Sequence, residues 1–220
     1  MDRFTYIQRL SRIEDDLPKL GNTINALKIT DAGIYGQNLE ALGIDAARRA
    51  ERISCSLRNL IFAADLVAPP ILMEQVAQEQ GITITHTAEL VEITLPGLMP
   101  KRTKKGNTTY LTDPLYYSLE AYTKEHELPH FEECVVCFTH VFDKKLSARR
   151  IRDYDNLECK QILDTASGFL MTDDSGLLCD AYHSTRLGKK DCTILSIMER
   201  KHFPKWLKEQ EKGADPLSVF

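Results

Sequence analysis

The chain has 220 residues, of which 43% are hydrophobic and 27% charged, and its formal net charge is −4. This length and hydrophobic fraction suffice for a packed core, in one sizeable domain or in a smaller domain with a helical extension. A slightly acidic chain does not bind nucleic acid over its whole surface, so any such contact must come from local basic segments. The chain has no apolar run long enough to cross a bilayer and no signal-peptide pattern after Met1, which predicts a cytoplasmic protein without a membrane partner.

Helix signals dominate residues 1–68, where we expect a helical extension. The first helix carries an apolar repeat at intervals of 4-3-4, formed by Tyr6, Leu10, Ile13 and Leu17. Pro18, followed by Gly21, predicts the end of that helix. A second helix is expected over residues 38–64, and its packing stripe consists of Ala46, Ala50, Ile53, Leu57, Leu60 and Ala64. The partner of this stripe is either the first helix, in an antiparallel hairpin, or a second subunit, and the short Ala-rich stripe favours the hairpin.

After the pair Pro69-Pro70 we expect a second domain over residues 69–200, followed by a tail over 201–220 that contains Trp206. Periodicity and turn residues predict helices over 71–80, 114–126 and 157–166. Strands are expected over 82–85, 88–95, 134–142, 177–183 and 192–199. Because helices and strands follow one another in mixed order, the sequence predicts an α+β fold.

The segment from Arg152 to Asn156 reads Arg-Asp-Tyr-Asp-Asn, and the pair Asp173-Asp174 follows it after one expected helix. If the first segment is extended, Asp153 and Asp155 face the same side, and Asp174 arrives from a second element. Hard oxygen ligands of this kind suit Mg²⁺ or Mn²⁺, which keep open positions for phosphate oxygens. Taken singly, Asp155 is also a good helix cap and the Asp pair a good turn, so these structural roles stay open.

Basic residues are concentrated in segments 101–105, 144–152 and 186–190. The candidates for contacts with a phosphate backbone are Lys101, Arg102, Lys104, Lys105, Arg149, Arg150 and Arg152. A charge run is also typical of a solvated face, and that interpretation stays open for each segment.

A different metal site is suggested by four residues whose types and spacing suit a structural zinc ion: His126, His130, Cys134 and Cys137. Against this interpretation, both cysteines lie in an expected strand, where residues three apart face opposite sides. The buried strand is therefore preferred, and a zinc-stabilised interaction module is kept as an alternative.

Residues from about 91 to 198 resemble the RusA family of Holliday junction resolvases. The resemblance rests on motifs in the same order: an opening strand at 91–96, a basic run, Asp153-x-Asp155-Asn156, a helix with Lys160 and Asp164, the pair Asp173-Asp174, and a last strand at 192–197. The helical extension has no counterpart in the minimal domain of that family.

The resemblance implies that Asp153, Asp155 and Asp174 are catalytic carboxylates that bind Mg²⁺ or Mn²⁺. It also implies a functional lysine four residues after the second Asp, where this chain has a cysteine, and Lys160 stands one place later. Lys160 is therefore the candidate, and its alternative role is an ion pair with Asp164.

The activity implied by the resemblance is that of a Mg²⁺-dependent endodeoxyribonuclease. Such an enzyme acts as a homodimer on branched DNA, the four-way junction, and serves DNA recombination and repair. A catalytically silent DNA-binding or regulatory protein with the same fold is the competing interpretation.

Overall fold

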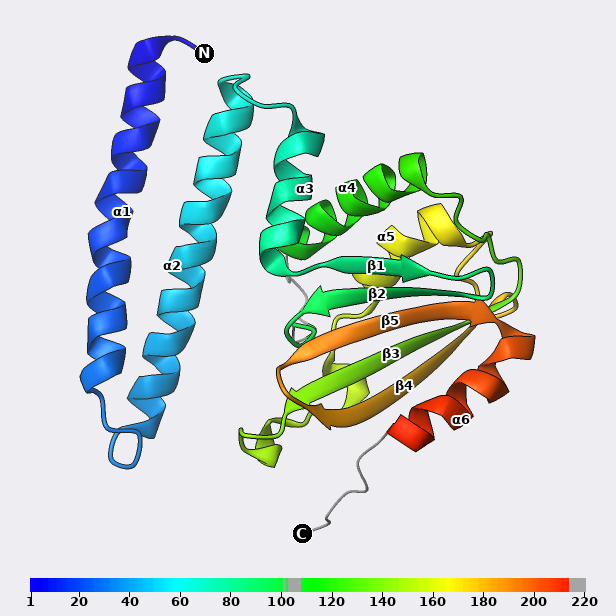
Figure 1. The fold of residues 1–220 in the computed structure, drawn as a ribbon. Helices are drawn as coiled ribbons and strands as arrows, with labels where there is room; N and C mark the ends of the chain where they lie inside the picture. The colour runs from blue at the N-terminus through cyan, green and yellow to red at the C-terminus, as the bar shows by residue number, and fades with distance from the viewer. Residues whose placement is uncertain (101, 103–107, 214–220) are drawn as a thin grey trace. The chain divides into compact units, whose positions relative to one another are not determined.

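The structure is a computed structural model that describes residues 1–100, 102 and 108–213, apart from the side chains of residues 148 and 211–213 (Figure 1). It divides into two compact units, Met1–Leu72 and Met73–Phe220. The boundary was expected after residue 68 and lies instead within the helix α3 (Pro69–Gln80). Gly81 follows this helix with a φ of 77°, a left-handed conformation that glycine adopts readily and that ends the helix as expected.

The first unit is a hairpin of two long helices, α1 (Arg3–Ile29) and α2 (Gly36–Ala63). The expectation that α1 ends at Pro18 is wrong, because the helix continues through that residue. Proline removes one backbone hydrogen bond but does not end a helix that packing holds in place. Beyond it, Leu20 packs against the buried cluster of the hairpin, which keeps the second half of α1 helical.

One face of each helix holds the hairpin together, within a single chain. Ile13 of α1 and the α2 residues Ile53 and Leu60 form its buried cluster. The Thr23 hydroxyl joins the two helices near their loop, where its Oγ1 lies 3.2 Å from the Asp45 carboxylate. Leu57 belongs to the expected stripe but is 38% exposed, so the contact face of α2 is centred on Ile53 and Leu60.

We therefore expect Ile53→Asp and Leu57→Asp to differ sharply. The first substitution replaces a buried apolar side chain of the cluster with a charged one and should lower the free energy of unfolding of the hairpin by about 3 kcal/mol or more. The second places its carboxylate at a half-open position, where water can solvate it. Urea unfolding followed by circular dichroism measures both, and equal losses would contradict the packing described here.

In the described part of the chain, the second unit is built on a five-stranded sheet with the order β1-β2-β5-β3-β4. In that order the strands are Thr83–His86, Leu90–Pro96, Cys192–Glu199, Cys134–Asp143 and Cys179–Gly188. Strands β3 and β4 pair in parallel, and the other neighbours are antiparallel. A parallel pair needs a crossover connection, which includes the helix α5 (Lys160–Leu170). The helices and the mixed sheet confirm the expected α+β class.

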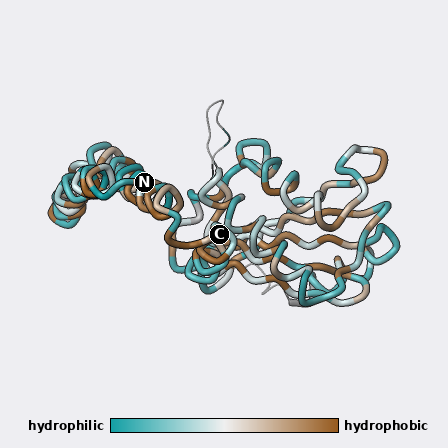
Figure 2. The backbone as a smooth tube through the Cα atoms, turned by 90° about the horizontal axis from the view of Figure 1, so that it is seen from above, coloured by the Kyte–Doolittle hydropathy of each residue, from teal (hydrophilic) through white to brown (hydrophobic). Residues whose placement is uncertain are grey.

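Helices cover both faces of this sheet (Figures 1 and 2). On one face, Leu115 of α4 (Thr109–Glu125) and Ile162 of α5 pack into the main core with Phe138 of β3. On the other face, Trp206 of α6 (Phe203–Gly213) packs with Cys137 of β3. The described part of the expected tail is therefore integral to the second unit.

Helices α4 and α5 begin three or more residues away from the starts that the sequence predicts. Helix α4 begins at Thr109, five residues before its expected start at Pro114, because its packing face already begins with the buried Leu111. Helix α5 begins at Lys160 and not at residue 157, because the connecting turn extends through Cys159. Strand β4 was expected over 177–183 and extends to Gly188, in register with the end of β3.

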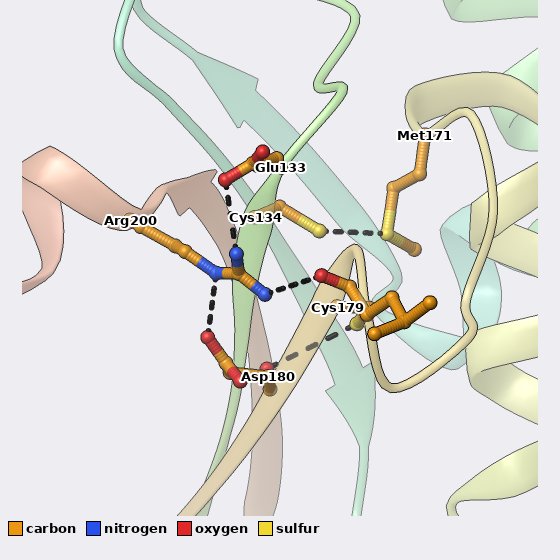
Figure 3. A network of polar contacts seen from close by, with 7 residues as sticks. Glu133, Cys134, Met171, Cys179, Asp180 and Arg200 are labelled. Atoms are coloured by element: carbon orange, nitrogen blue, oxygen red, sulfur yellow. Dashed lines mark hydrogen bonds and ion pairs between the residues drawn. The ribbon is translucent and has the colours of Figure 1, made fainter.

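Arg200, which follows β5, fastens the start of β4 (Figure 3). Its Nε donates to Asp180 at 2.7 Å, one Nη to Glu133 at 2.9 Å, and the other Nη to the Leu177 carbonyl at 2.8 Å. A guanidinium that engages three acceptors at fixed angles orders the chain around it better than a single exposed ion pair. The contact to Leu177 fixes one end of the loop that carries Asp174.

Candidate metal and nucleic-acid site

The first two candidate carboxylates lie in the connection from β3 to α5. Asp153 has an extended backbone, and Asp155 lies in the short 3-10 turn Tyr154–Asn156. The same-face argument required an extended segment, and it does not hold here, because residues two apart in a 3-10 turn point in different directions. Asp155 lines a cavity, while Asp153 is exposed outside the lining of that cavity.

Lys160 is the first residue of α5, and its side chain meets two carboxylates. Its Nζ lies 3.0 Å from Asp164 Oδ1 and 3.7 Å from Asp174 Oδ2. The hydrogen bond to Asp164 raises the pKa of Lys160, and the charge of Asp174 adds to this effect, so the side chain stays cationic. The ion pair with Asp164 and the proximity to Asp174 are thus present together.

A cavity of about 340 Å³ opens beside the N-terminus of α5. Its lining consists of Arg102, Tyr154, Asp155, Leu157, Glu158, Cys159, Lys160 and His183. The cations Arg102 and Lys160 here share one space with the acids Asp155 and Glu158. Glu158 is only 8% exposed, and its backbone N–H donates to the Pro100 carbonyl at 2.9 Å. No sequence pattern singled out Glu158.

Asp155 shares the cavity lining with Lys160 and Asp174 lies beside it, but the three carboxylates Asp153, Asp155 and Asp174 do not converge on one point. Among the described residues, one group of three His, Cys, Asp or Glu side chains brings its ligand atoms within 4.8 Å of one another. That group contains none of these three aspartates. Oxygen donors of the kind that Mg²⁺ prefers are present, which fits the chemistry of that ion. To bind one ion together, these side chains must change rotamer, which solvent-exposed carboxylates do readily.

The group that does converge consists of His140 of β3, His183 of β4 and Cys159, which immediately precedes α5. A nitrogen of each imidazole faces the other, with Nε2 of His140 and Nδ1 of His183 3.4 Å apart. The Tyr154 ring stacks on both imidazoles, with centroid distances of 5.5 and 5.1 Å. The Tyr154 hydroxyl lies 3.0 Å from the Thr185 hydroxyl, which fixes the ring in that place.

Burial governs the protonation of this group. It lowers the pKa of His140 to about 4, with a smaller contribution from His183, and it also lowers the pKa of His183. It raises the pKa of the Cys159 thiol to about 12. Both imidazoles are therefore neutral near pH 7. The three residues come from distant parts of the chain, so no spacing motif identifies them, and the only sequence signal was a histidine within an apolar strand.

The predicted basic residues have different surroundings. Arg150 pairs with Asp191, so its charge is engaged within the fold. Arg149 and Arg152 are exposed, and neither forms an ion pair within the described part of the chain. The Arg102 backbone N–H donates to the Asn156 carbonyl at 2.8 Å, which holds Arg102 next to the Asp155 turn. Lys101, Lys104 and Lys105 lie outside the described residues.

The alternative zinc set does not assemble. The Cys134 thiol contacts the Met171 sulfur at 3.2 Å on the α5 side of the sheet (Figure 3). Cys137 lies on the opposite face with Trp206, which confirms that residues three apart on this strand face opposite sides. His126 packs against the Tyr122 ring, and His130 lies 3.2 Å from the Thr172 hydroxyl. Strand alternation therefore separates the ligands that the spacing had suggested.

The fold and the site define an α+β protein with a charged cavity beside a helix N-terminus. Residues 2–219 match the profile of the family described as "Family of unknown function (DUF6100)", and the chain belongs to that family. The match spans both units, so the helical hairpin is part of the family pattern. No curated protein matches the chain. Within the described ranges, the helices lack the combined length and hydropathy that a transmembrane segment needs.

Proposed function

We propose that this protein is a metal-dependent, structure-selective DNA endonuclease that resolves four-way junctions. The observation that carries the proposal is the placement of three residues suggested by the RusA resemblance. Asp155 and Lys160 line one cavity, and Asp174 Oδ2 lies 3.7 Å from the Lys160 ammonium group. Asp155 and Lys160 are near one another in the sequence, while Asp174 comes from the loop after α5 and is brought to Lys160 by the fold.

Asp153, Asp155 and Asp174 would hold Mg²⁺ or Mn²⁺ through their carboxylate oxygens. When bound, the ion would polarise the scissile phosphodiester and provide a hydroxide at neutral pH. Lys160, held by Asp164, would contact a phosphate oxygen as a point charge. Arg102, on the lining of the same cavity, would hold the neighbouring phosphate and so orient the DNA strand.

The proposed enzyme acts as a homodimer on branched DNA. Two copies related by a two-fold axis would present two equivalent sites, which matches the opposed strands of a four-way junction. The second candidate function is a silent DNA-binding protein with the same fold. The observation that favours it is that Asp153, Asp155 and Asp174 do not converge on one point, since an enzyme would need them to do so.

Labelled four-way junction, flap and linear duplex substrates, each supplied with Mg²⁺, test this function. We expect paired nicks on opposed strands of the junction and no cutting of the duplex. Cutting confined to the flap would mean that the enzyme acts on flaps and not on four-way junctions. Junction binding without any cutting would support the silent DNA-binding protein.

The exposed Arg149 and Arg152 should contact phosphates, so a chain with both Arg149→Gln and Arg152→Gln should bind the junction less tightly. Its log–log salt slope should flatten by about 2, because each phosphate contact contributes about 0.9 to that slope. The matched control is Lys124→Gln with Lys205→Gln, which removes the same charge elsewhere on the second unit. A slope that is unchanged by the arginine pair would mean that these side chains only face solvent.

A further inference from the structure

We propose that His140, Cys159 and His183 form a second metal site, for a borderline transition-metal ion of which Zn²⁺ is the expected occupant. This site takes a different ion from the carboxylates and does not depend on nuclease activity. Thiolate and imidazole ligands favour Zn²⁺ over Mg²⁺, which prefers oxygen. The proposal rests on the convergence of three ligands from three elements, with ligand atoms within 4.8 Å of one another.

The distance between the two imidazoles supports a shared ion. Two nitrogens bound tetrahedrally to zinc at about 2.05 Å each lie about 3.3 Å apart. The facing nitrogens of His140 and His183 are 3.4 Å apart. That is longer than an ordinary hydrogen bond between ring nitrogens, which weakens the simpler explanation of a direct hydrogen bond.

The nitrogen of His140 that would bind the ion is Nε2, which faces His183. Its side chain is 1% exposed, and its Nδ1 is buried with no hydrogen-bond partner among the described residues. A buried ring nitrogen without a partner is costly, and most such groups in folded proteins are satisfied. An ion bound through Nε2 does not reach this Nδ1, so the metal site rests on Nε2 and its two neighbouring ligands alone.

Three protein ligands leave a fourth position on a tetrahedral ion, and the cavity beside Cys159 and His183 can provide it. A water molecule, or an oxygen of a bound anion, would complete the coordination there. Binding converts the Cys159 thiol to a thiolate and releases its proton to solvent, so the step is a simple exchange of one proton for the metal ion.

The ion would also order the proposed nuclease site. Tyr154 stacks on both imidazoles and stands between Asp153 and Asp155 in the chain. Fixing the two rings therefore fixes the turn that carries these carboxylates. This is a positioning role for the metal and for Tyr154.

Titration of the metal-free full chain with Co²⁺ tests the site without any DNA, so its outcome is separate from that of the nuclease proposal. We expect a thiolate-to-cobalt charge-transfer band that saturates at one ion per chain. Cys159→Ser should abolish the band, and His183→Ala should weaken Zn²⁺ binding at least about 10-fold. The control Cys179→Ser removes another buried thiol of the same unit and should leave the band intact.

X-ray absorption of the zinc-loaded wild-type chain keeps the test independent of how the variants fold. The expected first shell contains one sulfur and two imidazole nitrogens. A wild-type chain that gives no band, a band that survives in folded Cys159→Ser, or a first shell of oxygen alone would overturn the site.

Discussion

Asp155→Asn and Asp174→Asn should each lower the rate of junction cleavage by about 100-fold or more, while junction binding stays the same or becomes tighter. Each substitution removes one carboxylate charge beside Lys160, so Mg²⁺ would lose a ligand and the phosphate its electrostatic stabilisation. The basic residues that contact DNA remain. Single-turnover cleavage and a gel-shift titration on the same junction measure the two effects separately.

The control for these two variants is Glu132→Gln, which removes the same charge at an exposed position of the second unit, away from the cavity lining. It should cleave at the wild-type rate. If Glu132→Gln were as slow as the other two, net charge would explain the loss. If neither Asp variant were slower, the assignment of the metal ligands would be wrong.

Trp206→Ala should be the most damaging substitution on the α6 face of the sheet. Trp206 is 6% exposed and packs with Val135, Cys137 and Met198. Loss of such an aromatic side chain should lower the free energy of unfolding of the second unit by about 3–5 kcal/mol. Trp206 Nε1 reduces this loss somewhat, because it is a buried donor with no hydrogen-bond partner among the described residues, and the substitution removes it.

Chemical unfolding followed by far-ultraviolet circular dichroism measures this loss. Fluorescence is unsuitable, since the chain has one tryptophan. The control Lys208→Ala changes an exposed position of the same helix and should have a small effect. A midpoint for Trp206→Ala equal to that of the control would mean that α6 contributes nothing to the stability of the unit.

The fold class could be predicted because it follows from local periodicity. Strand β3 was recognisable as an apolar run, and the alternation of Cys134 and Cys137 between two faces followed from strand geometry alone. Local rules failed where tertiary packing outweighs them. Pro18 predicted the end of a helix that Leu20 extends by packing on the other arm of the hairpin, and Leu57 lies off the contact face despite its regular spacing.

The candidate site could be predicted only in part, for a related reason. A motif identifies residues that are close in sequence, so it pointed to Asp153, Asp155 and Asp174 as candidates, and the ion pair of Lys160 with Asp164 is the alternative role expected for that lysine. The turn that separates the directions of Asp153 and Asp155 could not be inferred from their spacing. His140 and His183 meet because β3 and β4 pair in parallel, a long-range contact that leaves no spacing pattern.

The most direct test of the proposed function is the rate of four-way junction nicking as a function of Mg²⁺ concentration, for the wild-type chain and for Asp174→Asn. The account predicts a wild-type rate that rises with Mg²⁺ to a plateau and vanishes in chelator, with no comparable rise for the variant. A wild-type chain that binds the junction but leaves it uncut at every Mg²⁺ concentration would contradict the account, as would cutting at the same rate by both chains.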